Sequence, residues 1–495
     1  MSDNFAALTT ASPVPPQMPD AGAPRWLRAR NPRTGLWDAA FPVPDQDHIA
    51  GKIAAMRAVQ PAWAAAPIAV RADLLRQFAE MLRRVRPDLQ VALEADTGRR
   101  LISISEIDAV IAAIEGWSAL SPRLLTDDWS AGRSNPSLRH RPQWVAYPLT
   151  VVISPWNFPL LLALIDAIPA LLAGCVVVVK SSEVTPRFAA ALQPVIERVE
   201  GLTALLWLLP GDAAVGAALI DHADIVCFTG SVATGRVVAR QAAERMIPAF
   251  LELGGKDPLL VLEGADLDAA SDAALRGAVL ATGQACQSIE RLLVARPLHD
   301  DFVALLAEKA KAVRFNWPDI AVGELGPIIF APQAAVLAAQ IEDALARGAQ
   351  LHCGGRIEHH GGGLWLAPTL LTGVTPAMAV MREESFGPLL PVMAFDHVDD
   401  AVTLANDSDF GLSAAVFAGS LDEAEAVGRR LEAGAVSLND AALTALFHEA
   451  PKQSFKLSGL GPSRMGLPGF TRFLRCKALI ANHARPLPLS RFSEG

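Results

Sequence analysis

The stretch Val176-Val-Val-Val-Lys-Ser-Ser-Glu-Val-Thr-Pro186 decides the fold class of this chain. A run of four valines is typical of a strand that is buried on both faces, as in a parallel sheet. A polar loop follows, and Thr185 is expected to cap a helix through residues 187–199, with Pro186 at the first helical position. This strand, loop and helix order predicts an α/β fold in which helices cover a parallel sheet.

The same alternation extends in both directions from the valine run. The predicted strands lie at residues 145–153, 224–228, 259–262 and 292–295. The predicted helices lie at residues 71–85, 104–118, 232–245, 300–313 and 332–347. Two α/β domains are therefore expected.

Residues 158–179 are long and apolar enough to suggest a membrane span. Asp166 lies near the middle of this segment, and Pro159 and Pro169 interrupt it. A buried helix followed by the valine strand explains the pattern better, so no membrane partner is expected.

The composition excludes several classes of protein. The chain has 495 residues, of which 51% are hydrophobic and 19% charged, which excludes an intrinsically disordered protein. Five cysteines are too few for a disulfide-rich scaffold. A net charge of −9 argues against binding of nucleic acid. Residues 1–25 lack the pattern of a secretory signal, so we expect a mobile leader on a cytoplasmic protein.

Cys286 differs from the other cysteines. It lies in Gly283-Gln-Ala-Cys-Gln-Ser288, a polar break where a thiol could be exposed and act as a nucleophile. Cys175 and Cys227 lie in apolar strands and are expected in the core. The chain has no C-x-x-C pair, and the cluster of Cys353 with His359 and His360 lacks a second cysteine, so no metal site is predicted.

Three further features leave alternatives open. The turn Phe228-Thr-Gly-Ser-Val-Ala-Thr-Gly235 could hold a phosphate at a helix start, or its glycines could serve only the turn. Glu252, between two leucines, is either a desolvated general base or an ordinary charge at a strand edge. Asn157, between two prolines, could donate to an oxyanion or could cap its own turn.

Taken together, these residues resemble the NAD(P)-dependent aldehyde dehydrogenase superfamily over residues 30–480. Six motifs occur in that family's order: Ser154-Pro-Trp-Asn-Phe-Pro159, Val179-Lys-Ser-Ser-Glu-Val-Thr-Pro186, Phe228-Thr-Gly-Ser231, Glu252-Leu-Gly-Gly-Lys256, Gly283-Gln-Ala-Cys286 and Glu383-Glu-Ser-Phe-Gly-Pro388. The resemblance implies a Rossmann-like cofactor domain over residues 26–128 and 147–253 and a second α/β catalytic domain over residues 254–445. Residues 129–146 and 446–495 would form a small oligomerisation β-extension, with its hairpin, C-terminal strand and tail, that joins a homodimer or homotetramer.

The resemblance also implies the chemistry. Cys286 would attack the aldehyde to form a thiohemiacetal, and Asn157 would stabilise the oxyanion together with the backbone N–H of Cys286. Glu252 would activate the water that hydrolyses the thioester to the carboxylic acid. The alternatives are transfer of the acyl group to coenzyme A, and an inactive binding protein with this fold.

The cofactor implied by the resemblance is NAD, with NADP possible. Lys180 and Glu183 would bind the adenosine ribose, and the Glu183 carboxylate would repel a 2′-phosphate and so favour NAD. Ser231 and Gly230 would lie at the pyrophosphate, and Glu384 and Phe386 at the nicotinamide ribose. The other cofactor contacts expected are Ile153, Pro155, Trp156, Ser182, Gly211, Phe228, Thr229 and Leu253.

The chain departs from the family pattern in two places. A Pro-x-Gly-Gly stretch is replaced by Pro451-Lys-Gln-Ser454, and the usual Lys-Pro-Ser/Ala-Glu by Lys180-Ser-Ser-Glu183. The first departure affects the substrate entrance. Residues 440–449, which would wall the substrate tunnel, contain apolar residues and no Lys or Arg, so a hydrophobic aldehyde, aromatic or medium-chain aliphatic, is expected.

Overall fold

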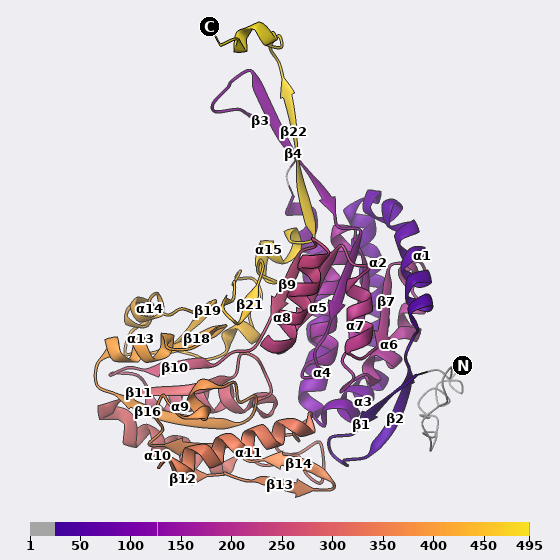
Figure 1. Cartoon of the computed structure of the whole chain (residues 1–495). Helices are drawn as coiled ribbons and strands as arrows, with labels where there is room; N and C mark the ends of the chain where they lie inside the picture. Colours follow the sequence, from indigo (N-terminus) through magenta and orange to yellow (C-terminus); the bar gives the residue numbers. More distant parts are fainter. Residues whose placement is uncertain (1–24, 126, 495) are drawn as a thin grey trace.

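The valine run lies in strand β6 (Val176–Ser181), which is wholly buried inside a parallel sheet. The computed structural model describes residues 25–125 and 127–494. These residues form two bodies and a projecting arm (Figure 1). Apart from Arg25, the predicted leader lies outside the described residues. The expected α/β fold is confirmed.

The helices and strands have the following bounds. The α-helices are α1 (Gln46–Ala65), α2 (Ile68–Arg84), α3 (Arg86–Thr97), α4 (Arg100–Leu120), α5 (Pro159–Ala173), α6 (Arg187–Glu197), α7 (Ala213–Ile220), α8 (Val232–Glu244), α9 (Leu267–Val279), α10 (His299–Ala312), α11 (Ala331–Ala346), α12 (Ala379–Arg382), α13 (Val398–Asn406), α14 (Leu421–Gly428) and α15 (Gly466–Thr471). The remaining strands are β1 (Trp26–Arg30), β2 (Trp37–Pro42), β3 (Ser130–Ala131), β4 (Leu138–Ala146), β5 (Leu149–Ile153), β7 (Leu206–Pro210), β8 (Ile225–Thr229), β9 (Ala249–Glu252), β10 (Asp257–Val261), β11 (Ile289–Ala295), β12 (Gln350–Cys353), β13 (Ile357–His360), β14 (Gly363–Leu366), β15 (Thr369–Thr372), β16 (Leu389–Phe395), β17 (Phe410–Gly411), β18 (Ser413–Phe417), β19 (Ala435–Leu438), β20 (Phe455–Lys456), β21 (Gly459–Leu460) and β22 (Leu474–Asn482).

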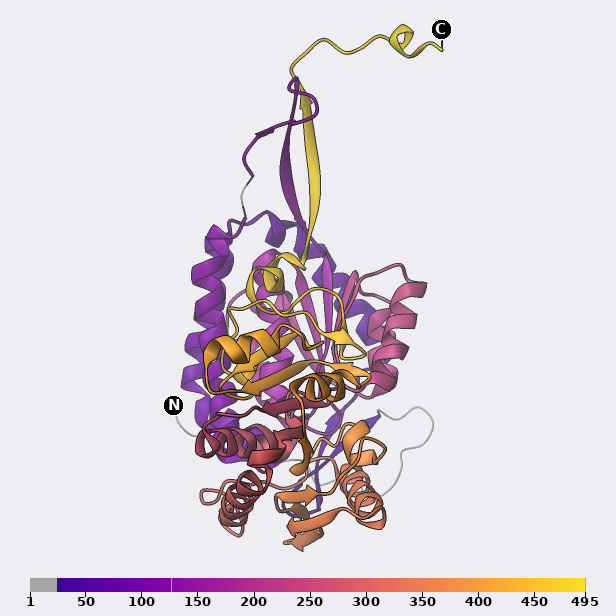
Figure 2. The same ribbon diagram turned by 90° about the vertical axis from the view of Figure 1, so that its left-hand side faces the viewer.

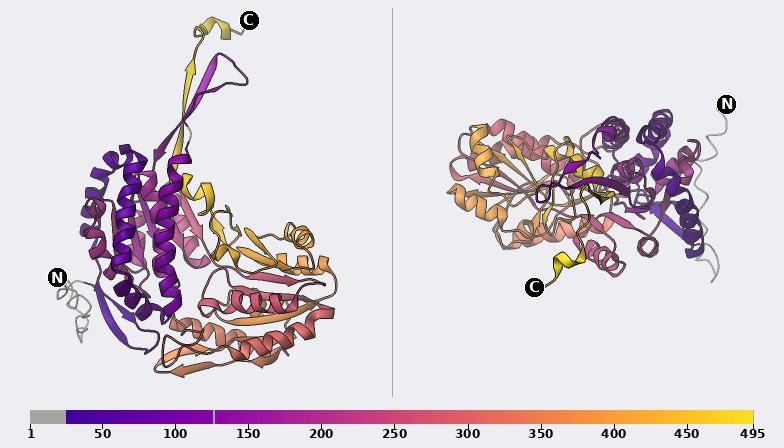
Figure 3. Two further views of the ribbon diagram at one scale, coloured as in Figure 1. Left: turned by 180° about the vertical axis from the view of Figure 1, so that it is seen from behind. Right: turned by 90° about the horizontal axis from the view of Figure 1, so that it is seen from above.

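The first body is built on a six-stranded sheet of order β21-β9-β8-β5-β6-β7. Its strands are parallel except β21, which comes from the far C-terminal part of the chain and pairs antiparallel with β9. Helices α2 and α4 lie on one face and α7 and α8 on the other (Figures 1 and 3). We propose this body as the core of the predicted cofactor domain.

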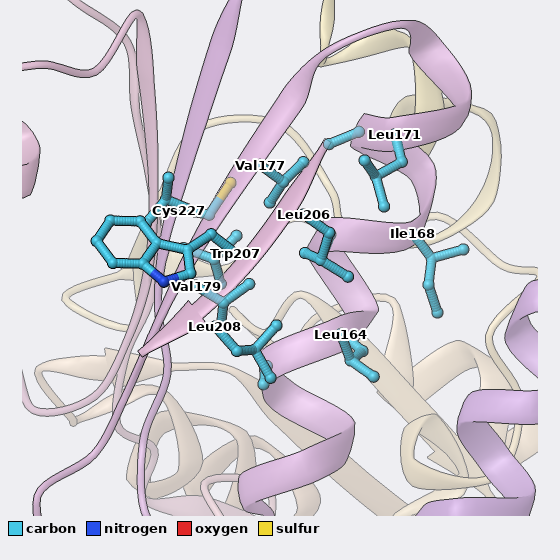
Figure 4. Close-up of a cluster of buried hydrophobic side chains, with 14 of the residues drawn as sticks. Leu164, Ile168, Leu171, Val177, Val179, Leu206, Trp207, Leu208 and Cys227 are labelled. Atoms are coloured by element: carbon cyan, nitrogen blue, oxygen red, sulfur yellow. The ribbon is translucent and has the colours of Figure 1, made fainter. Parts of the chain in front are cut away.

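Side chains from α5 pack directly on the valine strand. Figure 4 shows Leu164, Ile168 and Leu171 of α5 beside Val177 and Val179. All five are almost fully buried, at 0–1% exposure. The apolar segment 158–179 is therefore a core helix and strand, as predicted, and no helix among the described residues is long and apolar enough to cross a membrane.

The second body is built on a seven-stranded sheet of order β12-β15-β16-β11-β10-β18-β19. All neighbouring strands are parallel except the edge pair β12 and β15. Two apolar clusters cover its two faces, one including Phe302 and the other Leu337. We propose this body as the core of the predicted catalytic domain.

The arm is a three-stranded sheet of order β22-β4-β3 that extends away from both bodies (Figure 2). β4 and β22 pair antiparallel along their whole length, from Leu474 opposite Ala146 to Asn482 opposite Leu138. We propose the arm as part of the predicted β-extension. β21, which lies within the bounds predicted for that extension, instead belongs to the six-stranded sheet of the first body.

One predicted strand is wrong in its bounds. Residues 145–153 do not form a single strand, because Tyr147 and Pro148 separate β4 from β5. Pro148 has no backbone N–H to donate to a neighbouring strand. Val145 and Ala146 consequently end the arm, and the buried sheet begins at Leu149.

The predicted cap of α6 is also wrong. The Thr185 hydroxyl donates to the carbonyl oxygen of Trp156 at 3.2 Å and does not cap the helix. The carboxylate of Asp96, at the end of α3, instead accepts from the backbone N–H groups of Arg187 at 2.8 Å and Phe188 at 3.4 Å. The Arg187 guanidinium also donates to Asp96 at 2.7 Å. Asp96, about ninety positions earlier in the sequence, therefore caps the N-terminus of α6.

Replacing Asp96 by alanine is expected to lower the free energy of unfolding by about 3 kcal/mol, because the cap is lost and the Arg187 charge loses its fully buried partner. Urea denaturation followed by tryptophan fluorescence measures this change. Asp73→Ala removes the exposed partner of Arg76 and should change the same free energy by less than about 0.5 kcal/mol. Equal effects of the two variants would contradict the role given to Asp96.

Candidate active site

A cavity of about 510 Å³ lies at the carboxyl ends of β5, β6, β8 and β9 and reaches the second body. Ligands of open parallel sheets bind at such an edge. The predicted site residues that line it are Asn157, Glu252, Cys286, Ile153, Pro155, Trp156, Lys180, Ser182, Glu183, Phe228, Thr229, Gly230, Ser231, Leu253, Glu384 and Phe386. Gly211 is not part of the lining, but its carbonyl oxygen accepts from Lys180 Nζ at 2.8 Å.

Asn157 lies in the turn between β5 and α5 and is buried. Its side-chain amide donates to the carbonyl oxygen of Gln284 at 2.9 Å, two residues before Cys286. The Arg99 guanidinium donates to the carbonyl oxygens of Asn157 and Ala281, the latter at 3.2 Å. The amide of Asn157 is therefore held against the loop that carries Cys286 and does not merely cap its own turn.

The loop before Cys286 has an unusual backbone. Ala281, Thr282 and Gly283 have φ values of +56°, +64° and +67°. This left-handed region is costly for alanine and threonine, and such strain persists only where surrounding contacts impose it. Here the Thr282 hydroxyl donates to the carbonyl oxygen of Gly326 at 3.1 Å, and a Cβ on Gly283 would lie 2.4 Å from Gly387.

Cys286 lines the cavity and is half-buried. Burial raises the pKa of its thiol to about 12. Lys452 and Arg464 act in the opposite direction and lower this pKa, whereas Glu252 and Glu384 raise it further. Cys175 and Cys227, in contrast, are fully buried in the first body, as predicted.

Glu252 ends β9 and is mostly buried, with 14% of its side chain exposed. The Ser454 hydroxyl donates to its Oε2 at 3.4 Å. Lys452 Nζ lies 4.0 Å from Oε2, and Arg464 Nε lies 3.9 Å from Oε1. The carboxylate is thus mostly buried and has one hydroxyl group and two cations near it.

The start of α8 opens into the cavity at Gly230, Ser231 and Thr234. Ser231 caps this helix, because its Oγ accepts from Thr234 N at 3.3 Å. A Cβ on Gly230 would lie 2.6 Å from the Phe228 ring, so only glycine keeps this approach open. The backbone N–H groups and dipole of such a helix start suit a pyrophosphate.

Lys180 and Glu183 form the adjoining polar wall, with Lys180 Nζ 3.3 Å from Glu183 Oε2. Burial lowers the pKa of Lys180, and the nearby Glu183 carboxylate opposes that shift. This ammonium and carboxylate present both a donor and an acceptor to a ribose. The residues present therefore fit a dinucleotide.

Glu384 and Phe386 close the other end of the cavity. Glu384 Oε1 accepts from Gly255 N at 3.0 Å, and burial raises the pKa of its carboxyl to about 8. The Phe386 ring packs edge-on against Trp156, with 5.3 Å between ring centroids. These groups come from the second body, so the cavity is completed by both sheets.

Sequence reasoning missed several residues at this site. Helix α7 contributes Ala213, Gly216, Ala217 and Ile220, and α11 contributes Gln333 and Val336, with Phe330 just before it. Asp212, which caps α7, was an available signal for that helix.

Lys452 and Arg464 were also missed, although the loss of the glycine pair after Pro451 marked their segment as unusual.

The described residues contain no group of three or more His, Cys, Asp or Glu side chains that could hold a metal ion.

Comparisons with known proteins agree with the geometry. The family model described as "Aldehyde dehydrogenase family" matches residues 20–479. A protein of Mycolicibacterium smegmatis, named as a putative NADP(+) succinate-semialdehyde dehydrogenase, is 34% identical to this chain over 469 residues. The alignment covers 92% of this chain and 90% of that protein.

Solved structures are similar as well. One described as a "Putative Aldehyde Dehydrogenase" from Anabaena variabilis superposes with a TM-score of 0.92 at 48% identity, covering 94% of this chain and 99% of that chain. A betaine aldehyde dehydrogenase of Staphylococcus aureus in complex with NAD+ superposes with a TM-score of 0.87 at 27% identity. The match covers 94% of this chain and 93% of that chain. From its fold, its site and these relatives, the chain belongs to the aldehyde dehydrogenase family and is an NAD(P)-dependent aldehyde oxidoreductase.

Proposed function

We propose that this protein oxidises an aldehyde to the carboxylic acid through a thioester on Cys286, with hydrolysis by a water that Glu252 activates. The observation that carries the proposal is one cavity that gathers the Cys286 thiol, the Asn157 amide and the Glu252 carboxylate beside a helix start suited to a dinucleotide. When bound, NAD(P) would accept the hydride that the thiohemiacetal carbon on Cys286 loses as its C=O bond re-forms and the thioester results.

In the first half of the reaction, Cys286 Sγ attacks the carbonyl carbon, and the carbonyl oxygen becomes an oxyanion. The Asn157 amide, held next to the Cys286 loop, and the backbone N–H of Cys286 are the proposed donors to this oxygen. Arg99 supports this arrangement, because it binds the backbone of both loops.

In the second half, Glu252 takes a proton from water, which attacks the thioester carbon and releases the acid from Cys286. A carboxylate at this place favours hydrolysis over transfer to coenzyme A. Acceleration of NADH formation by added coenzyme A would support that alternative instead.

For the cofactor, we propose that Lys180 and Glu183 bind the adenosine ribose and that Ser231, with Gly230, lies at the pyrophosphate. Glu384 and Phe386 would face the nicotinamide ribose. Trp156 and Leu253 line the same cavity. We propose that the other predicted cofactor residues also contact the bound cofactor. They are Ile153, Pro155, Ser182, Gly211, Phe228 and Thr229.

For the substrate, we propose a hydrophobic aldehyde. The segment after β19 presents exposed Leu446 and Phe447, and Thr444 forms a hydrogen bond with Gln287, the neighbour of Cys286. The second candidate is a small polar aldehyde, which the names of the relatives favour, since they include succinate-semialdehyde and betaine aldehyde dehydrogenases.

We also propose that the arm joins subunits of a homodimer or homotetramer, since β22 exposes Leu479 and Ile480. Residence in the cytoplasm stays a prediction.

Cys286→Ala should reduce NADH formation from benzaldehyde, hexanal and succinic semialdehyde by about a thousandfold or more. The matched control is Cys476→Ala, which removes an exposed thiol on β22 and should leave the rate unchanged. Activity of Cys286→Ala at the wild-type rate would contradict the mechanism. The ranking of the three aldehydes by kcat/KM tests the substrate class, and succinic semialdehyde as the best substrate would favour the second candidate.

Glu252→Gln should give a burst of NADH equal to the enzyme concentration, followed by turnover reduced at least about a hundredfold. The thioester would form but would not hydrolyse. Stopped-flow absorbance measures the burst, and Glu263→Gln, an exposed position after β10, is the control. Full steady-state turnover in Glu252→Gln would remove this residue from its role.

Glu183→Gln should raise the ratio of kcat/KM for NADP to that for NAD about tenfold, because the carboxylate repels a 2′-phosphate. Steady-state kinetics with both cofactors measures the ratio. Glu197→Gln, at the exposed end of α6, should leave it unchanged. A wild-type preference for NADP would show that Glu183 does not select the cofactor.

A further inference from the structure

Glu290, a buried residue of β11, binds the backbone of the segment that carries Glu384 and Phe386. Its Oε2 accepts from Ser385 N at 2.7 Å, and its Oε1 accepts from Phe386 N at 2.8 Å. The Glu290 side chain is 3% exposed. One carboxylate therefore fixes two consecutive backbone N–H groups.

Lys256 compensates the charge of Glu290. Its Nζ, which is fully buried, donates to Glu290 Oε2 at 2.8 Å and to Ser385 Oγ at 2.9 Å. Either charge alone would be costly to bury, and the pairing offsets that cost. The preceding residue, Gly255, donates its N–H to Glu384 Oε1 at 3.0 Å. The segment before β10 thus contacts both Glu384 and Ser385.

Helix α11 binds the carbonyl groups of the same segment. Gln333 Nε2 donates to the carbonyl oxygen of Ser385 at 2.6 Å, and Gln340 Nε2 to that of Glu384 at 3.4 Å. Gln340 Oε1 also accepts from Ser385 Oγ at 2.7 Å. The segment is therefore held from two elements of the second body, with Glu290 binding its N–H groups and α11 its carbonyl groups.

Phe386 adopts a backbone conformation that depends on such contacts. Its φ is +52°, in the left-handed region that is costly for an aromatic residue. In this conformation its N–H reaches Glu290, and its ring packs edge-on against Trp156 of the first body, with 5.3 Å between centroids. Without the Glu290 acceptor the backbone can relax, and the ring can leave this position.

We propose that Glu290 is a positioning residue for the nicotinamide end of the cofactor, because its carboxylate holds Glu384 and Phe386 where they face the bound dinucleotide. Among the described residues that line the cavity are Glu384 and Phe386, but not Glu290 or Lys256. Glu290 acts by ordering the segment before the cofactor binds, which lowers the entropy lost on binding. The inference rests on the proposed function, which places Glu384 and Phe386 at the nicotinamide ribose.

The test compares the affinities for NAD and ADP, measured by isothermal titration calorimetry without an aldehyde, so that no turnover occurs. ADP contains the adenosine and the diphosphate but lacks the nicotinamide ribose. Glu290→Gln replaces one acceptor oxygen by an amide, so an N–H of the segment loses its partner. This variant should weaken NAD binding about tenfold and leave ADP binding within about twofold.

A double variant separates positioning from stability. Glu290→Gln leaves Lys256 buried without its counter-ion and should lower the melting temperature. Adding Lys256→Met removes that uncompensated charge and should recover part of the melting temperature, whereas NAD binding should stay weakened. The double variant also tests the proposal if Glu290→Gln alone does not fold.

Two further variants complete the design. Glu324→Gln removes a carboxylate from an exposed ion pair with Arg314, at 2.9 Å, and should leave both affinities unchanged. Phe386→Ala removes the ring that Glu290 is proposed to position and should weaken NAD binding but not ADP binding.

Unchanged NAD affinity in a folded variant without Glu290 would overturn the proposal, as would equal weakening of NAD and ADP. Recovery of the wild-type NAD affinity in the double variant would also overturn it and would leave Glu290 a role in stability alone. If Phe386→Ala also binds NAD normally, the proposed cofactor placement fails together with this inference. Weakened NAD binding in Phe386→Ala alone would overturn only the role of Glu290, and failure of the proposed mechanism is seen separately as an active Cys286→Ala.

Discussion

The arrangement of the site depends on one buried guanidinium. Arg99 lies between the turn of Asn157 and the loop of Cys286, which belong to different bodies, and donates to a carbonyl oxygen in each. Glu106, also buried, accepts from the N–H groups of Leu160 and Leu161 at the start of α5 and lowers the cost of burying Arg99. Burial still lowers the pKa of Arg99, to about 10. Together with the hydrogen bond from the Asn157 amide to Gln284, this charged side chain and its carboxylate partner therefore fix the relative positions of the two loops.

A second set of contacts brings the end of the chain back to the site. β21 pairs with β9, so Gly459 lies opposite Glu252. Arg464 and Arg472 then bind Asp166 of α5. These contacts explain why a segment some two hundred residues after Glu252 determines the polarity around that carboxylate. The first body is consequently incomplete without the C-terminal part of the chain.

The sequence predicted the parts of the structure that depend on local patterns. The valine strand and the buried helix before it follow from composition and spacing over a few residues, whereas Cys286, expected in a polar break where a thiol could be exposed, is half-buried. Asn157, Glu252 and the cofactor residues followed from the resemblance to a family, and the structure gathers almost all of them around one cavity. The wrong cap has a long-range cause, because Asp96 caps α6 from another helix. The wrong strand bounds have a local one, because Pro148 separates the strand that pairs with β22 from the buried strand β5. Lys452 and Arg464 could not be placed, because Glu252, which both approach, lies some two hundred residues earlier in the chain.

The cap that Asp96 supplies has a consequence for variation in this protein. In many helices the start depends on side chains of the preceding loop, so a substitution in the loop also weakens the helix. Here α6 begins without help from residues 181–184, since its first N–H groups are bound by a carboxylate of α3. The loop that contains Glu183 therefore supplies no side-chain cap to α6. The exposed Glu183 can therefore be replaced without removing a cap from α6.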